Sequence, residues 1–232
     1  MSLPSLVTPE YTIQIPSTKQ KINYRPFLVK EEKILLTAME AGESEDITKA
    51  IKNVMRNCIL SDVDIDKLSF FDFEYIFLML RNKSVGNTLD LTFLHDCKEP
   101  KVENRVIVDL DSIKVTFPKE HTDKIMIDDT YGVKMKYPTL GDTDSYQNLN
   151  TKNILNILSN CIEFVYDDKN VYDEFTEEEM NAFIESMNKN QLEKILEFFQ
   201  TMPSLQHTVK YECKNCKKKV SHEVKGLTSF FT

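Results

Sequence analysis

The chain has 232 residues and a formal net charge of −8, with 41% hydrophobic and 28% charged residues. This length supports one large domain or two small ones, and the acidic charge disfavours nucleic acid as a main partner because phosphate binding needs a basic face. No segment reaches the roughly 18 consecutive apolar residues of a membrane span, the start lacks the pattern of a secretory signal, and five cysteines favour reduced thiols in cytosol.

Residues 1–86 predict an extended arm followed by three helices. Apolar residues alternate between Tyr11 and Tyr24 around a Pro-Ser-Thr turn, which predicts a hairpin. Apolar residues at helical spacing predict one helix over about 28–41, ended by glycine, and a second that starts after Ser44. The third, about 70–84, is apolar on nearly every side and must be buried by this chain or by another.

The remaining chain divides into a middle sheet, a helical segment and a C-terminal hairpin. Residues 87–137 contain five short period-two runs, which predict one antiparallel sheet with one wet face. Residues 138–203 return to helical spacing, with a capping box at Thr176–Glu179. Residues 204–232 predict a hairpin and an apolar tail. The predicted class is α+β, with the helical N-terminal and C-terminal parts packed together, the antiparallel sheet inserted between them, and a C-terminal CxxC hairpin.

The pair Cys213 and Cys216 is the strongest chemical motif, because two thiolates at this spacing in a tight turn can coordinate one Zn²⁺. His207 and His222 flank the pair symmetrically. In a regular hairpin these histidines pair with each other, about 20 Å from the cysteines at ~3.3 Å per residue, so only bulges would bring them to the metal. Other ligands could come from His95 and Cys97 or from a second chain. The alternative is a reduced, metal-free pair in a turn.

Catalytic arrangements find little support in the sequence. A redox CxxC needs the N-terminus of a helix, whereas both flanks of Cys213–Cys216 alternate like strands. His95 and Cys97 lie two residues apart on a predicted strand, about 6.6 Å, which is too far for a nucleophile and its base unless the chain bends before the following proline. We therefore predict that the protein is not an enzyme and has no catalytic residues.

Two features suggest contacts with other proteins. Lys217, Lys218 and Lys219 form a basic tip on an acidic chain, interpreted either as a solvated turn or as a contact for an acidic neighbour. Phe230 and Phe231 near the chain end either fold back into the core or insert into a partner. The residues alone leave two functions open: a protein-assembly component, with a homo-oligomer as a further possibility, and a zinc-knuckle module that contacts protein or nucleic acid.

Three segments carry a resemblance to a known family: PFLVKEEKILLTAME at 26–40, NCI at 57–59 and FDFEYIFLMLRNKSVG at 71–86. Together with the C-terminal YECKNC and GLTSFF patterns, they resemble the baseplate hub subunit and hub assembly chaperone family of T4-type contractile-tailed bacteriophages. The resemblance implies a protein made in the bacterial host cytoplasm that acts during assembly of the central hub, and then stays in the virion baseplate or leaves it. It implies phage baseplate hub proteins as partners and no catalytic residues.

Overall fold

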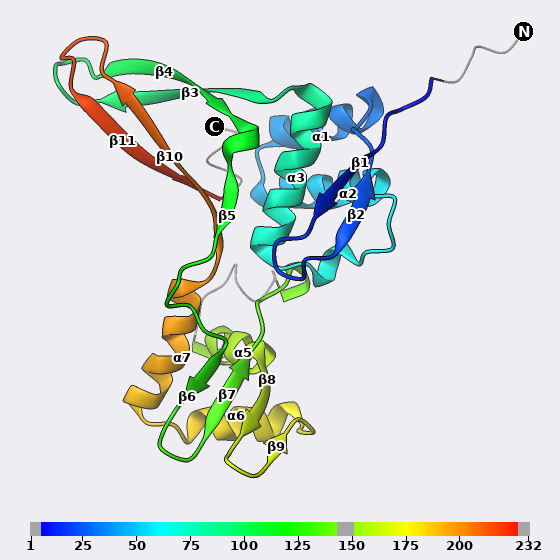
Figure 1. Cartoon of the computed structure of the whole chain (residues 1–232), viewed down its shortest axis with the longest axis vertical. Coiled ribbons are helices and arrows are strands. Elements are labelled where there is room, and N and C mark those ends of the chain that lie inside the picture. Colours follow the sequence, from blue (N-terminus) through cyan, green and yellow to red (C-terminus); the bar gives the residue numbers. More distant parts are fainter. Residues whose placement is uncertain (1–5, 143–150, 227–232) are drawn as a thin grey trace, which may run out of the picture. The chain divides into compact units, whose positions relative to one another are not determined.

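The computed structural model describes residues 6–142 and 151–226 (Figure 1). Helices and antiparallel strands are both well represented, which confirms the α+β class. The described residues form two compact units. Unit 1 draws on Met1–Ile65, Phe71–Thr116 and Ser204–Thr232, and unit 2 on Asp66–Phe70 and Phe117–Pro203.

The N-terminal half of unit 1 has the predicted hairpin and three helices. Its elements are β1 (Tyr11–Gln14), β2 (Lys21–Tyr24), α1 (Val29–Ala41), α2 (Ser44–Cys58) and α3 (Phe70–Val85), with the short η1 (Ile65–Lys67) before α3. Strands β1 and β2 pair antiparallel, with Tyr11 opposite Tyr24. Gly42 ends α1 at a φ of 78°, a left-handed conformation that glycine adopts without a Cβ clash.

Helix α3 is buried on most sides within this chain. Its buried apolar side chains are Phe71, Phe73, Ile76, Phe77, Leu78 and Leu80. Leu80 belongs to a core cluster with Tyr24 of β2 and with Val54 and Cys58 of α2. Its polar side chains also have partners in unit 1, since Asp72 accepts hydrogen bonds from Ser17 in the β1–β2 turn. The apolar surface of this helix is therefore mainly core, which answers the question that the sequence left open.

The strands of unit 1 form two further sheets beside the N-terminal hairpin. Strands β3 (Thr88–His95) and β4 (Val102–Asp109) pair with each other, and β10 (Ser204–Glu212) lies between β11 (Lys219–Lys225) and β5 (Lys114–Thr116). The short η2 (Leu110–Ser112) connects β4 to β5. All five strands predicted between residues 87 and 137 exist, but the prediction of one sheet is wrong. Strand β5 pairs with a strand from the end of the chain, and period-two spacing does not specify a partner.

Unit 2 has its own sheet and its own core. Its strands β6 (Lys124–Met126), β7 (Gly132–Met135), β8 (Ile162–Tyr166) and β9 (Val171–Tyr172) are antiparallel in that order. The helices are α5 (Thr151–Cys161), α6 (Glu177–Glu185) and α7 (Lys189–Thr201), with η3 (Leu140–Asp142) before them. Thr176 and Glu179 form the predicted capping box at the start of α6.

The packing of the N-terminal and later helices as one body stays a prediction from the sequence, and each group of helices has a core of its own. Buried residues of α5, α6 and α7 form a cluster with Val133, Met135 and Val165 of the unit 2 sheet. Their apolar faces are used within unit 2, whereas α1, α2 and nearly all of α3 belong to unit 1. The four segments expected from the sequence therefore do not coincide with the two compact units.

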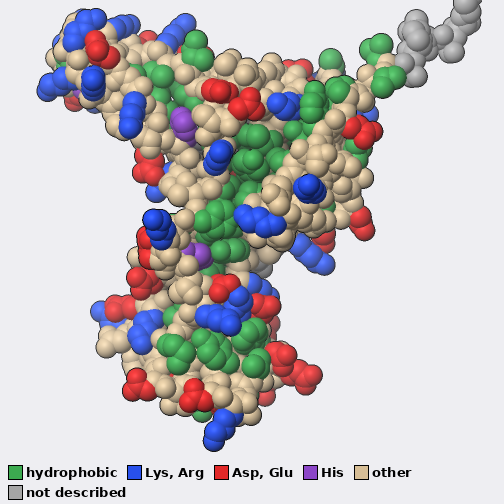
Figure 2. Space-filling view, viewed as in Figure 1, with side chains coloured by type: hydrophobic (Ala, Val, Ile, Leu, Met, Phe, Trp, Pro, Cys, Tyr) green, Lys and Arg blue, Asp and Glu red, His purple; other side chains and the backbone are tan. Residues whose placement is uncertain are grey.

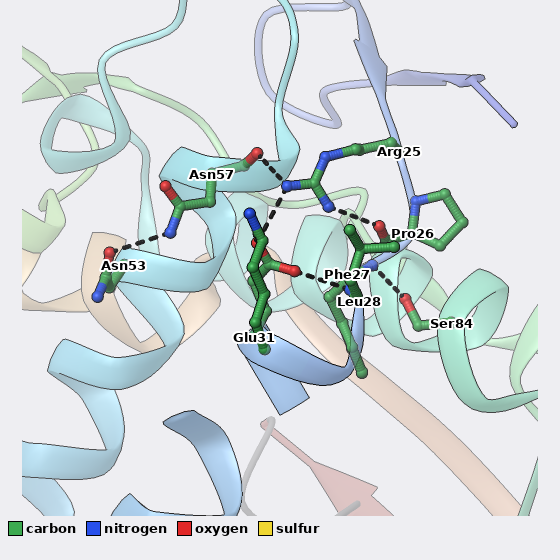
Figure 3. A network of polar contacts seen from close by, with 9 residues as sticks. Arg25, Pro26, Phe27, Leu28, Glu31, Asn53, Asn57 and Ser84 are labelled. Atoms are coloured by element: carbon green, nitrogen blue, oxygen red, sulfur yellow. Dashed lines mark hydrogen bonds and ion pairs between the residues drawn. The ribbon is translucent and has the colours of Figure 1, made fainter. Parts of the chain in front are cut away.

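A buried ion pair joins the beginning of α1 to the residue that follows β2 and to the end of α2 (Figure 3). Glu31 is only 1% exposed, although it lies in the first turn of a helix. Its carboxylate accepts hydrogen bonds from the Arg25 guanidinium at 3.0 Å and from the Leu28 N–H at 2.8 Å. Arg25 also donates to the Asn57 carbonyl at 3.0 Å. Burial alone would raise the pKa of Glu31, but these hydrogen bonds and the nearby cations lower it below its ordinary value.

We expect Glu31→Gln to lower the free energy of unfolding at pH 7 by about 2 kcal/mol, because it removes a charge-assisted hydrogen bond from Arg25. A lowered native pKa stabilises the fold above the unfolded pKa of about 4.3, and this contribution disappears as the pH falls through the native pKa. The difference between variant and wild type should therefore shrink in acid. Urea unfolding followed by circular dichroism, carried out at pH 7 and in acid, measures this difference in stability. The exposed Glu32→Gln variant is the control. An equal loss of stability in that control contradicts the assignment.

Candidate metal centre

The turn between β10 and β11 holds Cys213 and Cys216. The last pair of the ladder is Glu212 opposite Lys219, so residues 213–218 form the connection. The Cys213 N–H donates to the Lys218 carbonyl at 2.9 Å, and the Lys217 N–H donates to the Cys213 carbonyl at 2.9 Å. Cys213 is buried, and the pair sits between two strands instead of at the start of a helix, which is the context that the sequence predicted.

The loop between β3 and β4 brings two more metal-binding side chains to this turn. Strand β3 ends at His95, and the Cys97 N–H turns back to the His95 carbonyl at 3.2 Å. The ligand atoms of His95, Cys97, Cys213 and Cys216 all lie within 4.8 Å of one another. The Cys97 and Cys213 sulfur atoms are 3.8 Å apart. The sequence left two sources of further ligands open, His95 with Cys97 or a second chain. The structure brings His95 and Cys97 to the CxxC pair.

Polar contacts fix one loop against the other. Buried Asn104 of β4 accepts a hydrogen bond from the Lys214 N–H at 2.9 Å and donates to the Val102 carbonyl at 2.9 Å. The Asn215 amide donates to the Cys97 sulfur at 3.5 Å. Hydrogen bonds from backbone and amide groups therefore help to hold the two cysteine-bearing segments together, in addition to the contact between the thiols.

The flanking histidines do not pair as the sequence predicted. His207 lies opposite Val224 and His222 opposite Val209, because the turn closes on Cys213 and Lys218 instead of on Cys213 and Cys216. His222 has another role. Its ring stacks on Phe93 of β3 with 5.0 Å between centroids and on Tyr211 at 5.7 Å. Among the described residues, neither histidine belongs to the four-residue cluster.

The thiol groups of the cluster differ in their acidity. Burial alone would raise the pKa of Cys213, but the backbone N–H groups of Cys216 and Asn215 and the neighbouring thiols lower it to about 7. At Cys97 the Asn215 amide favours the thiolate, yet burial and the adjacent cysteines raise the pKa above its ordinary value. A lowered pKa favours the thiolate of Cys213, which is the form that binds a metal and also the form that acts as a nucleophile. The carboxylate of Asp96 lies 3.5 Å from the Lys101 ammonium. The convergence of four ligand atoms within 4.8 Å is what points to a metal site.

Exposed lysines surround the cluster at the ends of the two hairpins. Figure 2 shows basic side chains gathered at this end of unit 1. The predicted tip residues Lys217, Lys218 and Lys219 are all exposed, as are Lys98 and Lys214. The other predicted contact residues, Phe230 and Phe231, lie outside the described residues.

Comparison with known proteins places the chain in a phage structural family. The family model described as T4 bacteriophage base plate protein matches residues 8–232. The chain therefore belongs to the T4 bacteriophage base plate protein family. No curated protein and no solved structure matched it. In the part of the chain that the structure describes, no helix combines the length and apolar character needed to cross a bilayer.

We expect Phe93→Ala to loosen the contact between the two hairpins. Phe93 is half-buried and stacks on Tyr211 and His222, so its loss should cost about 2 kcal/mol. Amide hydrogen exchange in β10 and β11 should then speed up about thirtyfold. The matched control is Leu94→Ala, the next residue on the opposite, solvent-exposed face of β3. Equal exchange rates in the two variants would argue against the stack.

Proposed function

We propose that this base plate family member is a hub protein, acting either as a structural component or as an assembly chaperone of the central hub. The family match supports a baseplate role, and the hub assignment rests on the resemblance in residues 26–40, 57–59 and 71–86. Assembly of a hub brings protein surfaces together. The structural question is therefore which surface of this chain is suited to bind another protein.

Helix α1 offers such a surface, and this observation carries the proposal. The helix buries the charged Glu31 but leaves Val29, Leu36 and Met39 at 81%, 54% and 47% exposure. Spacings of seven and three residues place these three apolar side chains on one side of the helix. Large apolar side chains grouped on a helix exterior are typical of protein interfaces. All of the helix except its last residue, Ala41, lies within the first segment that carries the resemblance.

Two further regions complete the proposed contact set. The exposed tip Lys217–Lys219 is suited to an acidic neighbour, because its three ammonium groups attract carboxylates. Phe230 and Phe231 are proposed as apolar contacts to the same partners. Each region can be tested separately because the tip lies on the β10–β11 hairpin and the two phenylalanines follow it in the chain.

A hollow of about 360 Å³ in unit 2 is lined mainly by apolar and aromatic side chains: Tyr131, Val165, Tyr172, Phe175, Glu179, Met180 and Phe183. Its acid, Glu179, already accepts a hydrogen bond from the Thr176 N–H in the capping box. A convergent acid and base, which general acid–base chemistry needs, are not assembled there.

We expect Leu36→Glu to weaken co-purification with co-expressed hub proteins of the same phage at least tenfold, because it places a charge in the apolar contact face. Thr37→Glu adds the same charge to a neighbouring exposed position on another side of α1 and should bind normally. Pull-down from phage-infected cells, quantified by mass spectrometry, measures the difference. Retention of hub proteins by the Leu36 variant would contradict the proposal.

The same pull-down compared with finished particles separates the two forms of the role. A chaperone should be found with hub proteins in the host cytoplasm and be absent from purified virions. A structural component should be found in both. Capture of hub proteins by the wild-type chain is the positive control for both comparisons.

We expect charge reversal at the tip, with Lys217→Glu and Lys219→Glu, to weaken hub binding more strongly at low salt than at high salt. The matched control reverses Lys119 and Lys169, two exposed lysines of unit 2.

Truncation after Gly226 tests Phe230 and Phe231 and should weaken binding while leaving the circular dichroism spectrum unchanged. Normal binding by the truncated chain would remove the tail from the mechanism.

A further inference from the structure

We propose that His95, Cys97, Cys213 and Cys216 bind one Zn²⁺ as a closed structural site that joins the β3–β4 loop to the β10–β11 turn. The inference goes beyond the hub role and does not depend on it. Its basis is the assembly of four ligand atoms within 4.8 Å of one another, drawn from two segments far apart in the sequence.

The spacing of the ligand atoms fits a tetrahedral ion. With Zn–S bonds of about 2.3 Å, the sulfur atoms at two corners of a tetrahedron lie about 3.8 Å apart. The Cys97 and Cys213 sulfur atoms are separated by 3.8 Å. That distance is far longer than the roughly 2.05 Å of a disulfide. The pair therefore has the geometry of two ligands of one ion.

The donor set favours zinc in a structural role. Three thiolates and one imidazole form a Cys₃His set, which is typical of four-coordinate structural zinc. All four ligands come from one chain, so no position is left for a reacting molecule. A single chain also supplies the whole site, which predicts about one zinc per monomer instead of one per dimer.

The surroundings hold the sulfur ligands in place. Two backbone hydrogen bonds of 2.9 Å, from the Cys213 N–H to the Lys218 carbonyl and from the Lys217 N–H to the Cys213 carbonyl, close the turn that carries Cys213 and Cys216. The Asn215 side chain donates to the Cys97 sulfur, which lies on the other segment. Asn104 fixes the backbone of the turn at Lys214. These groups position the ligands before any ion binds.

The basic tip also fits this site. Three thiolates and one Zn²⁺ carry a net charge of −1, since each cysteine binds in its deprotonated form. Exposed lysines follow or separate the ligands on both segments: Lys98, Lys101, Lys214, Lys217, Lys218 and Lys219. Their positive charge offsets the charge of the occupied site.

The experiment measures zinc in the full-length chain, purified under reducing conditions without added metal. We expect about one zinc per chain by elemental analysis, and at least a tenfold loss in Cys97→Ser and in Cys213→Ser. His207→Ala is the matched control and should retain zinc, because this histidine lies outside the cluster. Asn215→Ala should bind about tenfold more weakly in a competition with a chelator.

A second measurement keeps the proposal testable if the cysteine variants fail to fold. In the wild-type chain, bound zinc should protect Cys97, Cys213 and Cys216 from alkylation, and a chelator should expose them together. Replacement of zinc by Co²⁺ should give the intense absorption of a tetrahedral thiolate complex. Wild-type protein without zinc, a Cys97–Cys213 disulfide, or zinc retained in Cys97→Ser would each overturn the assignment. Failure of hub binding would leave all of these readouts unchanged.

Discussion

The structure of unit 1 depends on the burial of α3, a helix with little polar surface. Such a helix must be enclosed, and each polar group on it needs a partner because an unpaired buried group costs about 1–3 kcal/mol. The partners come from different parts of unit 1. Ser17 donates to Asp72 near the beginning of the helix, Asn82 donates to Asp111 at 2.8 Å, and Ser84 accepts from the Phe27 N–H at 2.9 Å. These contacts determine where the N-terminal hairpin and η2 can lie.

The end of α3 also determines where the paired hairpins begin. Strand β3 starts three residues after the last residue of the helix, and the Leu110 N–H donates to the Asn87 carbonyl at 2.8 Å. This bond closes the base of the β3–β4 hairpin beside the buried side chain of Leu110. At the other end, the four-residue cluster joins the same hairpin to β10–β11. The β3–β4 hairpin is thus fixed at its base by the core of unit 1 and at its tip by polar and sulfur-containing side chains.

The sequence predicted local elements well because local patterns encode them. The three N-terminal helices, the five middle strands and the hairpin at Cys213–Cys216 all follow from spacing and from capping residues. Strand partners did not follow, since β5 and β10 are far apart in the chain and alternation carries no information on pairing. The burial of Glu31 was also missed. A glutamate in the first turn of a helix is ordinarily exposed, and only its position three residues after Leu28 pointed to a hydrogen bond with that N–H.

The candidate metal centre was partly predictable for the same reason. The CxxC pair was recognised from its spacing, and His95 and Cys97 were named as a ligand source, but treating them as part of one continuous strand kept their side chains apart. The polar segment before Pro100 was the available indication that the strand ends at His95. The pairing of His207 with His222 was wrong because the turn is longer than the cysteine spacing suggests.

The pairing of β5 with β10 has a consequence for how the chain passes between its two units. Ser204 lies opposite Thr116, so the chain leaves unit 1 and returns to it on neighbouring strands, about 5 Å apart. The chain also enters and leaves unit 2 at Asp66–Phe70, so it passes between the units at four places. This short segment is held in unit 2 by a backbone bridge between Ser69 and Thr139. Replacing residues 117–203 alone would therefore remove the bridging partner of Ser69, which ties the sequence of one segment to the fold of the other.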